Sequence, residues 1–163
     1  MIRGYFDWAA TSPMSNEALQ AYHDAAIEYI GNPSSVHPEG QRAAAFLRSC
    51  RRRVADVLGV SSETIVFTSG GTEADSIAIL SQLWRKSPAR IVFSAIEHDA
   101  VLQHKRIMEE RGFDVCIAPA PSGYVDLDKL DRLLDVPVTL VCVMLANNVL
   151  GTVQDLKSIV ALI

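Results

Sequence analysis

The pattern of apolar and polar positions predicts strands and helices that alternate along most of the chain. Short apolar runs rich in β-branched and aromatic residues predict strands over residues 65–67, 91–94, 113–118 and 138–145. Amphipathic stretches between and after them predict helices over 72–84, 100–111 and 126–134, with a last helix opening at Gln154-Asp155. Asp126 is the predicted cap of the third, and the inward positions predicted for the first are Ala74, Ile77, Ala78 and Ser81. Strands separated by helices are typical of βαβ units. The predicted fold class is therefore α/β, a three-layer α/β/α arrangement with a mostly parallel sheet.

Two helices are predicted before this alternating part. The first is capped by Ser15 and runs to about residue 30, and the second covers residues 39–58 and stops at Gly59. The second carries an apolar stripe, expected to be buried, that consists of Ala43, Leu47, Cys50, Val54 and Val57. Its arginines at 48, 51, 52 and 53 mostly lie off that stripe. We interpret them as a solvated face, with a site for an acidic partner as the second alternative.

The turn after the first predicted strand has the residues of an anion site. Gly70 and Gly71 allow a tight turn, and Thr72 is a good N-cap for the helix that follows. Free backbone N–H groups at a helix start, flanked by hydroxyl side chains, favour a phosphate group. The alternative is a strand-to-helix turn that needs glycine for geometry alone. The spacing matches neither the P-loop nor the dinucleotide fingerprint.

Three loops are expected to meet at one edge of the sheet. Ligands of parallel sheets bind beyond the carboxyl ends of the strands. The loops 68–72, 95–99 and 146–151 each follow a predicted strand there, and they carry Gly71, Thr72, His98, Asn147 and Asn148. This convergence is stronger evidence for a site than any one motif.

Composition excludes several classes of function. A net charge of -4 gives no reason to expect nucleic acid or a membrane as partner. The first residues lack the apolar core of a signal peptide, and no apolar run reaches membrane-spanning length. The three cysteines have no metal-ligand spacing and are expected to be buried thiols. The sequence therefore predicts a cytoplasmic protein without a metal site.

The last predicted helix ends on apolar residues with no Gly, Asn or Lys to cap it. A helix end without partners indicates missing structure. We expect a domain that is incomplete at its C-terminal end or is completed by a partner chain.

Five segments occur in an order that resembles the N-terminal part of a cysteine desulfurase. They are FDWAATSP (6–13), GNPSSVHPEG (31–40), FTSGGTE (67–73), EH (97–98) and NN (147–148). Cysteine desulfurases are NifS-like enzymes that use pyridoxal 5'-phosphate (PLP), and they belong to the class V aminotransferase group of fold-type I. The resemblance covers about residues 5–156. It implies that residues 1–38 form an N-terminal segment and helix, and residues 39–163 a PLP-binding large domain truncated at its C-terminal end.

The resemblance assigns a role to each candidate site residue. Gly71 and Thr72 match the positions that hold the cofactor phosphate. His98 matches the catalytic histidine that stacks on the pyridine ring and moves protons, and an imidazole titrates near neutral pH as that role requires. Asn148 matches the asparagine near the cofactor O3′ and the substrate carboxylate. For His37 the resemblance implies a structural role.

The chain departs from the family pattern at two kinds of position. The family has a glutamate after the paired asparagines, where this chain has Val149. The lysine that binds the cofactor covalently, the aspartate at the pyridinium nitrogen and the catalytic cysteine all lie beyond residue 163 in the family. Lys86, Lys105, Lys129 and Lys157 match no cofactor-binding motif. We therefore expect the isolated chain to be inactive.

By resemblance, the whole enzyme would convert L-cysteine to L-alanine and pass on the sulfur as a persulfide, for Fe–S cluster or thionucleoside synthesis. Expected partners are a second copy in a homodimer or a complementing chain, and a sulfur-acceptor protein. One alternative is a selenocysteine lyase or another class V enzyme. The other is a non-catalytic remnant, or half of a split protein, that acts by assembly.

Overall fold

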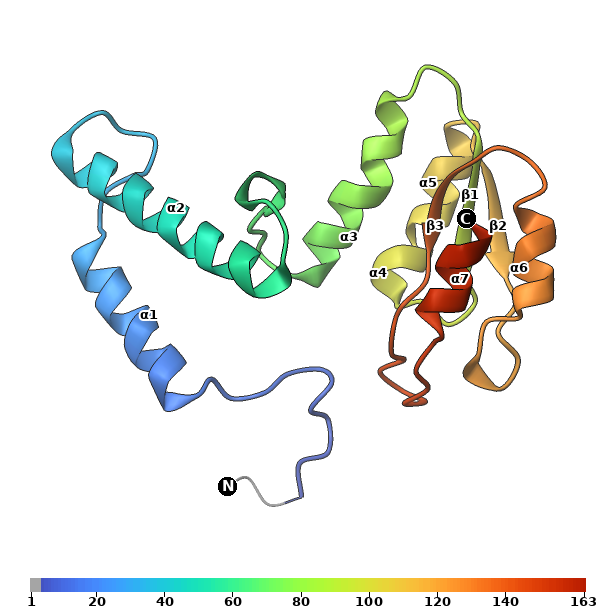
Figure 1. Ribbon diagram of the computed structural model, residues 1–163, viewed down its shortest axis with the longest axis horizontal. Coiled ribbons are helices and arrows are strands. Elements are labelled where there is room, and N and C mark those ends of the chain that lie inside the picture. Colours follow the sequence, from blue (N-terminus) through green and yellow to red (C-terminus); the bar gives the residue numbers. More distant parts are fainter. Residues whose placement is uncertain (1–3) are drawn as a thin grey trace. The chain divides into compact units, whose positions relative to one another are not determined.

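The chain forms two compact units in the computed structural model, which describes residues 4–163. The boundary between the units falls between Phe67 and Thr68 in the sequence. The second unit therefore contains all the candidate site residues, Gly71, Thr72, His98 and Asn148. Figure 1 shows α1 and α2 in the first unit, and the sheet with the remaining α-helices in the second. The division predicted from the resemblance, an N-terminal segment of residues 1–38 and a large domain of residues 39–163, refers to the whole enzyme and stays a prediction.

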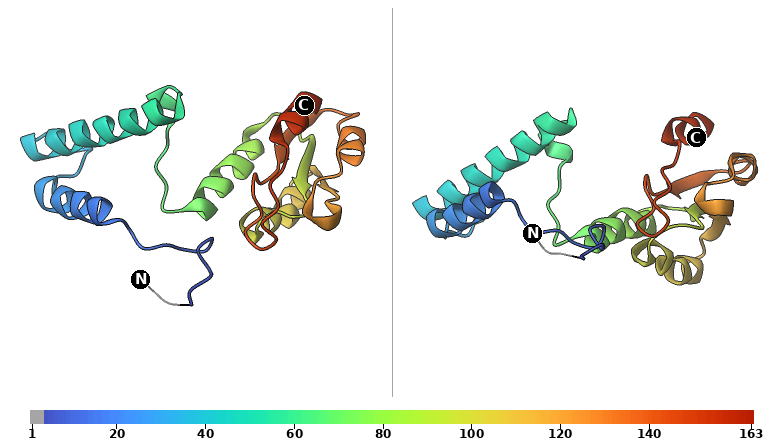
Figure 2. Two further views of the ribbon diagram at one scale, coloured as in Figure 1. Left: turned by 60° about the horizontal axis from the view of Figure 1, so that its bottom comes forward. Right: turned by 90° about the horizontal axis from the view of Figure 1, so that it is seen from below.

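The first unit is built on two helices that pack through a few side chains. Helix α1 (Asn16–Glu28) is capped by Ser15, as predicted, since the Ser15 side chain accepts a hydrogen bond from the Ala18 N–H. Helix α2 covers Pro38–Leu58. The rings of Tyr29 and Phe46 stack with centroids 4.0 Å apart and join the two helices. Both views in Figure 2 show α1 lying beside α2.

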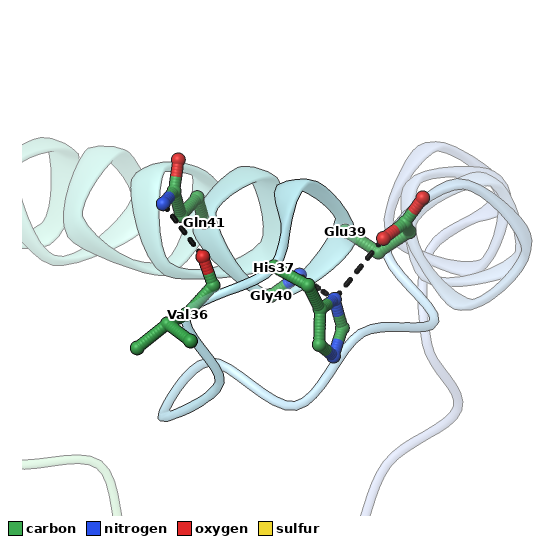
Figure 3. Close-up of polar contacts among 5 residues, drawn as sticks. All are labelled: Val36, His37, Glu39, Gly40 and Gln41. Carbon is green, nitrogen blue, oxygen red and sulfur yellow. Dashed lines mark hydrogen bonds and ion pairs between the residues drawn. The ribbon is translucent and has the colours of Figure 1, made fainter.

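The loop between α1 and α2 is held closely against the start of α2. A Cβ on Gly31 would lie 2.4 Å from the backbone of Glu39, so this close approach requires glycine. His37 caps α2, because its Nδ1 accepts a hydrogen bond from the Gly40 N–H at 3.3 Å (Figure 3). Gln41 donates to the Val36 carbonyl at 2.7 Å on the same turn. His37 thus has a structural role in this loop.

Two predictions for the first unit are wrong. Of the predicted apolar stripe on α2 only Ala43 is buried, and Val57 is 86% exposed. Residues 65–67 form no strand; they follow the short 3-10 helix η1 (Ser62–Thr64) without regular secondary structure, with Ile65 in an extended conformation. Arg51 holds this segment by donating from Nε to the Ile65 carbonyl at 3.0 Å. A strand requires a partner strand for its hydrogen bonds, and none of the described residues supplies one here.

The second unit contains the predicted parallel sheet. Its strands are β1 (Arg90–Ser94), β2 (Asp114–Ala118) and β3 (Val138–Cys142), in the order β2-β1-β3. Both strand pairs are parallel, with Val92 of β1 opposite Cys116 of β2 and Val141 of β3. The predicted strand order in the sequence is confirmed for these three, although β3 ends three residues earlier than expected.

Helices cover both faces of this sheet, which confirms the three-layer arrangement. The helices are α3 (Gly71–Leu80), α4 (Asp99–Leu102), α5 (His104–Glu110), α6 (Leu127–Leu133) and α7 (Leu156–Leu162). On one face Phe93 packs with Ile79 of α3 and Met108 of α5. On the other, Val92 packs with Leu130 of α6 and Ile159 of α7. Val92 and Phe93 therefore pack into hydrophobic clusters on opposite faces of the sheet, because side chains alternate between the two faces along a strand.

Helix boundaries differ from the prediction in two places. Helix α3 ends at Leu80 and continues as the 3-10 helix η2 (Ser81–Trp84). Its buried residue is Ile79, whereas the four positions predicted to face inward are exposed. The helix predicted over 100–111 is divided into α4 and α5 at Gln103. A third 3-10 helix, η3 (Pro121–Gly123), follows β2. Among the described residues no helix is long and apolar enough to cross a membrane.

Candidate active site

The start of α3 is open to an anion. Gly70 is the N-cap and makes no side-chain capping bond, so the prediction that Thr72 caps this helix is wrong. Thr72 lies inside the first turn, where the backbone N–H groups have no partner within the helix. A Cβ on Gly70 or Gly71 would meet no atom within 4 Å, so the backbone here is accessible on its Cβ side. The residues present therefore fit a phosphate group.

Of the hydroxyl side chains around this turn, those of Thr68, Ser69 and Thr72, the first two are bound within the protein. Glu73 accepts hydrogen bonds from the backbone N–H and the hydroxyl of Ser69, both at 2.6 Å. These bonds lower the pKa of the Glu73 carboxyl below its ordinary value. Thr68 donates its hydroxyl to the Gly70 carbonyl at 3.0 Å. The phosphate ligands that remain are the N–H groups at the start of α3 and the Thr72 hydroxyl.

His98 lies at the carboxyl end of β1 with a fixed ring. It is the N-cap of α4, and its Nδ1 accepts a hydrogen bond from the Ala100 N–H at 3.0 Å. Because Nδ1 is the acceptor, the neutral ring carries its proton on Nε2. The His98 side chain is exposed, so a flat ligand has access to the ring.

The loop after β3 is a tight hairpin organised by Asn147. The Asn147 Oδ1 accepts hydrogen bonds from the N–H groups of Val149 at 2.9 Å and Leu150 at 2.7 Å. Its backbone pairs with Thr152 and Gly151, and Ala146 bridges Val153. Asn148 lies exposed at the turn. Asn147 is thus the structural member of the pair, which leaves the Asn148 amide available to a ligand.

A hollow of about 410 Å³ lies at the carboxyl edge of the sheet, between the loop after β1, the end of β3 with the two residues that follow it, and helices α3 and α4. Of the predicted site residues only His98 lines it; Gly71, Thr72 and Asn148 do not. Asp75, Glu97, His98 and Cys142 are among its lining residues. The structure thus brings His98 and α3 to the same hollow. Sequence reasoning gave no role to Glu97 or Asp75, and the position of Glu97 directly before His98 was the available signal.

The thiol of Cys142 is predicted to be inert at neutral pH. Burial, with Glu97 and Asp75 as nearby negative charges, raises the pKa of Cys142 to about 12. Because only the thiolate is nucleophilic, iodoacetamide at pH 8 should alkylate Cys142 at least about 100-fold more slowly than free cysteine. Peptide mapping by mass spectrometry measures this rate, with the urea-unfolded chain as control. Labelling of Cys142 at the rate of free cysteine would contradict the prediction.

None of the described residues forms a cluster of three or more side chains able to hold a metal ion. The groups described at this edge include an imidazole, an amide and helix N–H groups, a set that fits an organic phosphate with a flat ring.

Comparison with known proteins gives one consistent result. The model of the aminotransferase class-V family matches residues 4–163. A NifS/IcsS protein homolog of Lactobacillus delbrueckii subsp. bulgaricus is 40% identical over 158 residues, and the cysteine desulfurase IscS of Dictyoglomus turgidum is 35% identical over 158 residues. Among solved structures, a NifS-like protein matches 99% of this chain at a TM-score of 0.91 and 35% identity. The structure of SspA in complex with cysteine matches 97% at a TM-score of 0.86 and 31% identity.

These matches cover a part of each relative. Each of the two curated relatives matches 95% of this chain, which corresponds to 41% of the length of the first and 40% of the second. The NifS-like structure is matched over 45% of its chain. The chain spans the N-terminal portion of these proteins, as the resemblance implied. With the family model matched over residues 4–163 and the same fold in the NifS-like structure, the chain belongs to the class-V aminotransferase family.

Proposed function

We propose that this chain is the N-terminal part of a PLP-dependent cysteine desulfurase. The observation that carries the proposal is the hollow that His98 shares with α3 and the end of β3, in a chain that matches cysteine desulfurases over 95% of its residues. The whole enzyme would transfer the sulfur of L-cysteine to a thiol, which yields L-alanine and a persulfide.

In this proposal each candidate residue has a task that its surroundings allow. The N–H groups of Gly71 and Thr72, at the uncapped start of α3, bind the phosphate. The exposed ring of His98 stacks on the pyridine ring, and its Nε2, the nitrogen not used in capping α4, holds or moves a proton. The Asn148 amide orients the cofactor O3′ and the substrate carboxylate without adding charge. When bound, PLP itself supplies an electron sink for the substrate carbanion.

The isolated 163-residue chain is predicted to bind the cofactor without a covalent anchor. Lys129 is in an ion pair with Asp126, Lys105 pairs with Glu109, and Lys86 and Lys157 are exposed. None of them thus has the surroundings of an activated lysine. After incubation with PLP and reduction with borohydride, mass spectrometry should find only scattered, substoichiometric lysine labels.

Calorimetry on the untreated chain tests whether the cofactor site itself is present. Pyridoxine 5'-phosphate lacks the aldehyde and cannot react with lysine, so calorimetry with this compound measures the non-covalent site alone. Saturable binding of one molecule per chain supports the proposal. A stoichiometric adduct at one lysine would overturn the expected lack of an anchor, and no binding would favour a protein that acts by assembly.

The proposal extends to the partners of the whole protein. We infer a cytoplasmic homodimer, or a pair with a complementing chain, and a protein that accepts the sulfur. Exposed apolar side chains on α2 and beyond, such as Val57, Leu58 and Val60, are available for such contacts. Assays of the whole protein with L-cysteine and L-selenocysteine distinguish a desulfurase from a selenocysteine lyase, since only a desulfurase forms a persulfide from L-cysteine.

A further inference from the structure

The carboxylate of Glu97 joins the two loops that carry His98 and Asn148. Its Oε1 accepts a hydrogen bond from the Ser94 hydroxyl at 2.6 Å and from the Met144 N–H at 2.7 Å. Ser94 is fully buried at the end of β1, and Met144 lies just beyond β3. One oxygen atom therefore fixes the end of β3 to the end of β1.

A second hydrogen bond joins the same loops, and here the side chain belongs to the loop after β3. The Asn147 Nδ2 donates to the Ile96 carbonyl at 2.9 Å, while its Oδ1 holds the hairpin through Val149 and Leu150. The loop after β1 thus contributes an acceptor at Ile96 and another at Glu97, and the loop after β3 contributes both donors. Two crossing bonds of this kind prevent the loops from sliding past each other along the strand direction.

Both joining residues stand directly before a residue that the proposed function assigns to the cofactor. Glu97 precedes His98, whose ring is fixed further by the Ala100 N–H at 3.0 Å. Asn147 precedes Asn148 at the exposed turn. Because neighbouring Cα atoms are about 3.8 Å apart, a shift of either joining residue moves its neighbour by a similar distance. Ligand geometry of this kind fails at errors of about 1 Å.

We propose that Glu97 and Asn147 are positioning residues that hold His98 and Asn148 in one fixed arrangement at the carboxyl edge of the sheet. This inference rests on the proposed function for its ligand, a pyridoxine-type phosphate, and on the hydrogen bonds for its mechanism. Neither residue needs to touch that ligand. Glu97 also lines the hollow beside His98, so loss of its carboxylate frees the loop at the point where the ring of the ligand would lie.

Comparing Glu97→Gln with Glu97→Ala tests the inference, because both bonds of Glu97 end on Oε1. A glutamine oxygen can accept both, and alanine can accept neither. In the 163-residue chain Glu97→Ala should weaken binding of pyridoxine 5'-phosphate by about tenfold or more, with Glu97→Gln within about threefold of the parent, since one or two hydrogen bonds of positioning are lost. Inorganic phosphate, which needs only the start of α3, should bind the parent chain, Glu97→Gln and Glu97→Ala with equal affinity. Glu110→Ala, at an exposed ion pair on α5, is the matched control.

Amide exchange without any ligand separates this inference from the proposed function. In Glu97→Ala the Met144 N–H should exchange at least about tenfold faster, with NMR shifts at both His98 and Asn148, and Glu97→Gln should show neither change. If the parent binds no pyridoxine 5'-phosphate but these exchange results hold, the proposed function fails and the positioning stands. Where the parent binds pyridoxine 5'-phosphate, an equal loss of this compound and of inorganic phosphate in Glu97→Ala, or the parent's affinity for both, would overturn the positioning role. An unchanged exchange rate of the Met144 N–H would overturn it in either case.

Discussion

Replacing Gly71 with aspartate is expected to weaken phosphate-ester binding about 30-fold while leaving the fold intact. Gly71 is the first residue of α3, and a side chain there would meet no atom within 4 Å. An acidic residue in the first turn suits the helix dipole, so stability should hold or rise slightly. The same carboxylate would repel a phosphate, and about 2 kcal/mol of repulsion at a partly exposed site corresponds to an affinity loss of about 30-fold. Calorimetry with pyridoxine 5'-phosphate and a thermal melt measure the two effects.

Gly71→Ala separates charge from bulk in this experiment. It adds one methyl group in open space and keeps the backbone N–H that binds the anion. Its affinity should remain within a few-fold of that of the parent chain. Equal binding by Gly71→Asp and the parent would place the phosphate elsewhere and remove the start of α3 from the site.

The largest loss of stability is expected from Phe93→Ala. Phe93 is fully buried in β1, the central strand, and packs against Ile79, Val101 and Met108. Truncation leaves a cavity that neighbouring helices fill only partly, and such changes cost about 3–5 kcal/mol. Native-state exchange of the Val92 amide, in the same strand, reports the free energy of unfolding of the second unit without interference from the first.

Trp84→Ala is the control, since Trp84 has a larger ring in the same unit but is 91% exposed. The free energy of unfolding of the second unit should differ between Trp84→Ala and the parent chain by no more than about 0.5 kcal/mol. If Phe93→Ala cost as little as Trp84→Ala, the core on this face of the sheet would be assigned wrongly.

Local signals in the sequence were sufficient wherever a neighbour along the chain supplies the partner. Ser15 and Asp126 were predicted as helix caps, and each accepts a hydrogen bond from an N–H three residues later. Gly59 was predicted to end α2, and it has the left-handed conformation of that position. The order of β1, β2 and β3 and the parallel sheet followed from apolar runs separated by helices.

Predictions failed where the partner is remote in the sequence. The apolar residues 65–67 satisfy every local requirement of a strand, yet no strand of the described chain pairs with them. The stripe on α2 was correct as a pattern, but burial needs a second surface, and Val57 has none among the described residues. In α3 the predicted inward positions missed Ile79, because the direction of the helix relative to the sheet decides which residue meets Phe93.

The candidate site divides in the same way. The sequence by itself determined that glycines and a threonine stand at a helix start, that His98 and Asn148 follow strands, and, through the order of its motifs, which family the chain resembles. Only the tertiary structure decided what holds these residues in place. Glu97 meets Met144 across 47 positions and Asn147 meets Ile96 across 51, contacts that exist because β1 and β3 are neighbours in the sheet. The pattern of apolar and polar residues cannot predict such pairs, because each hydrogen bond joins two residues whose neighbours in the sequence are unrelated.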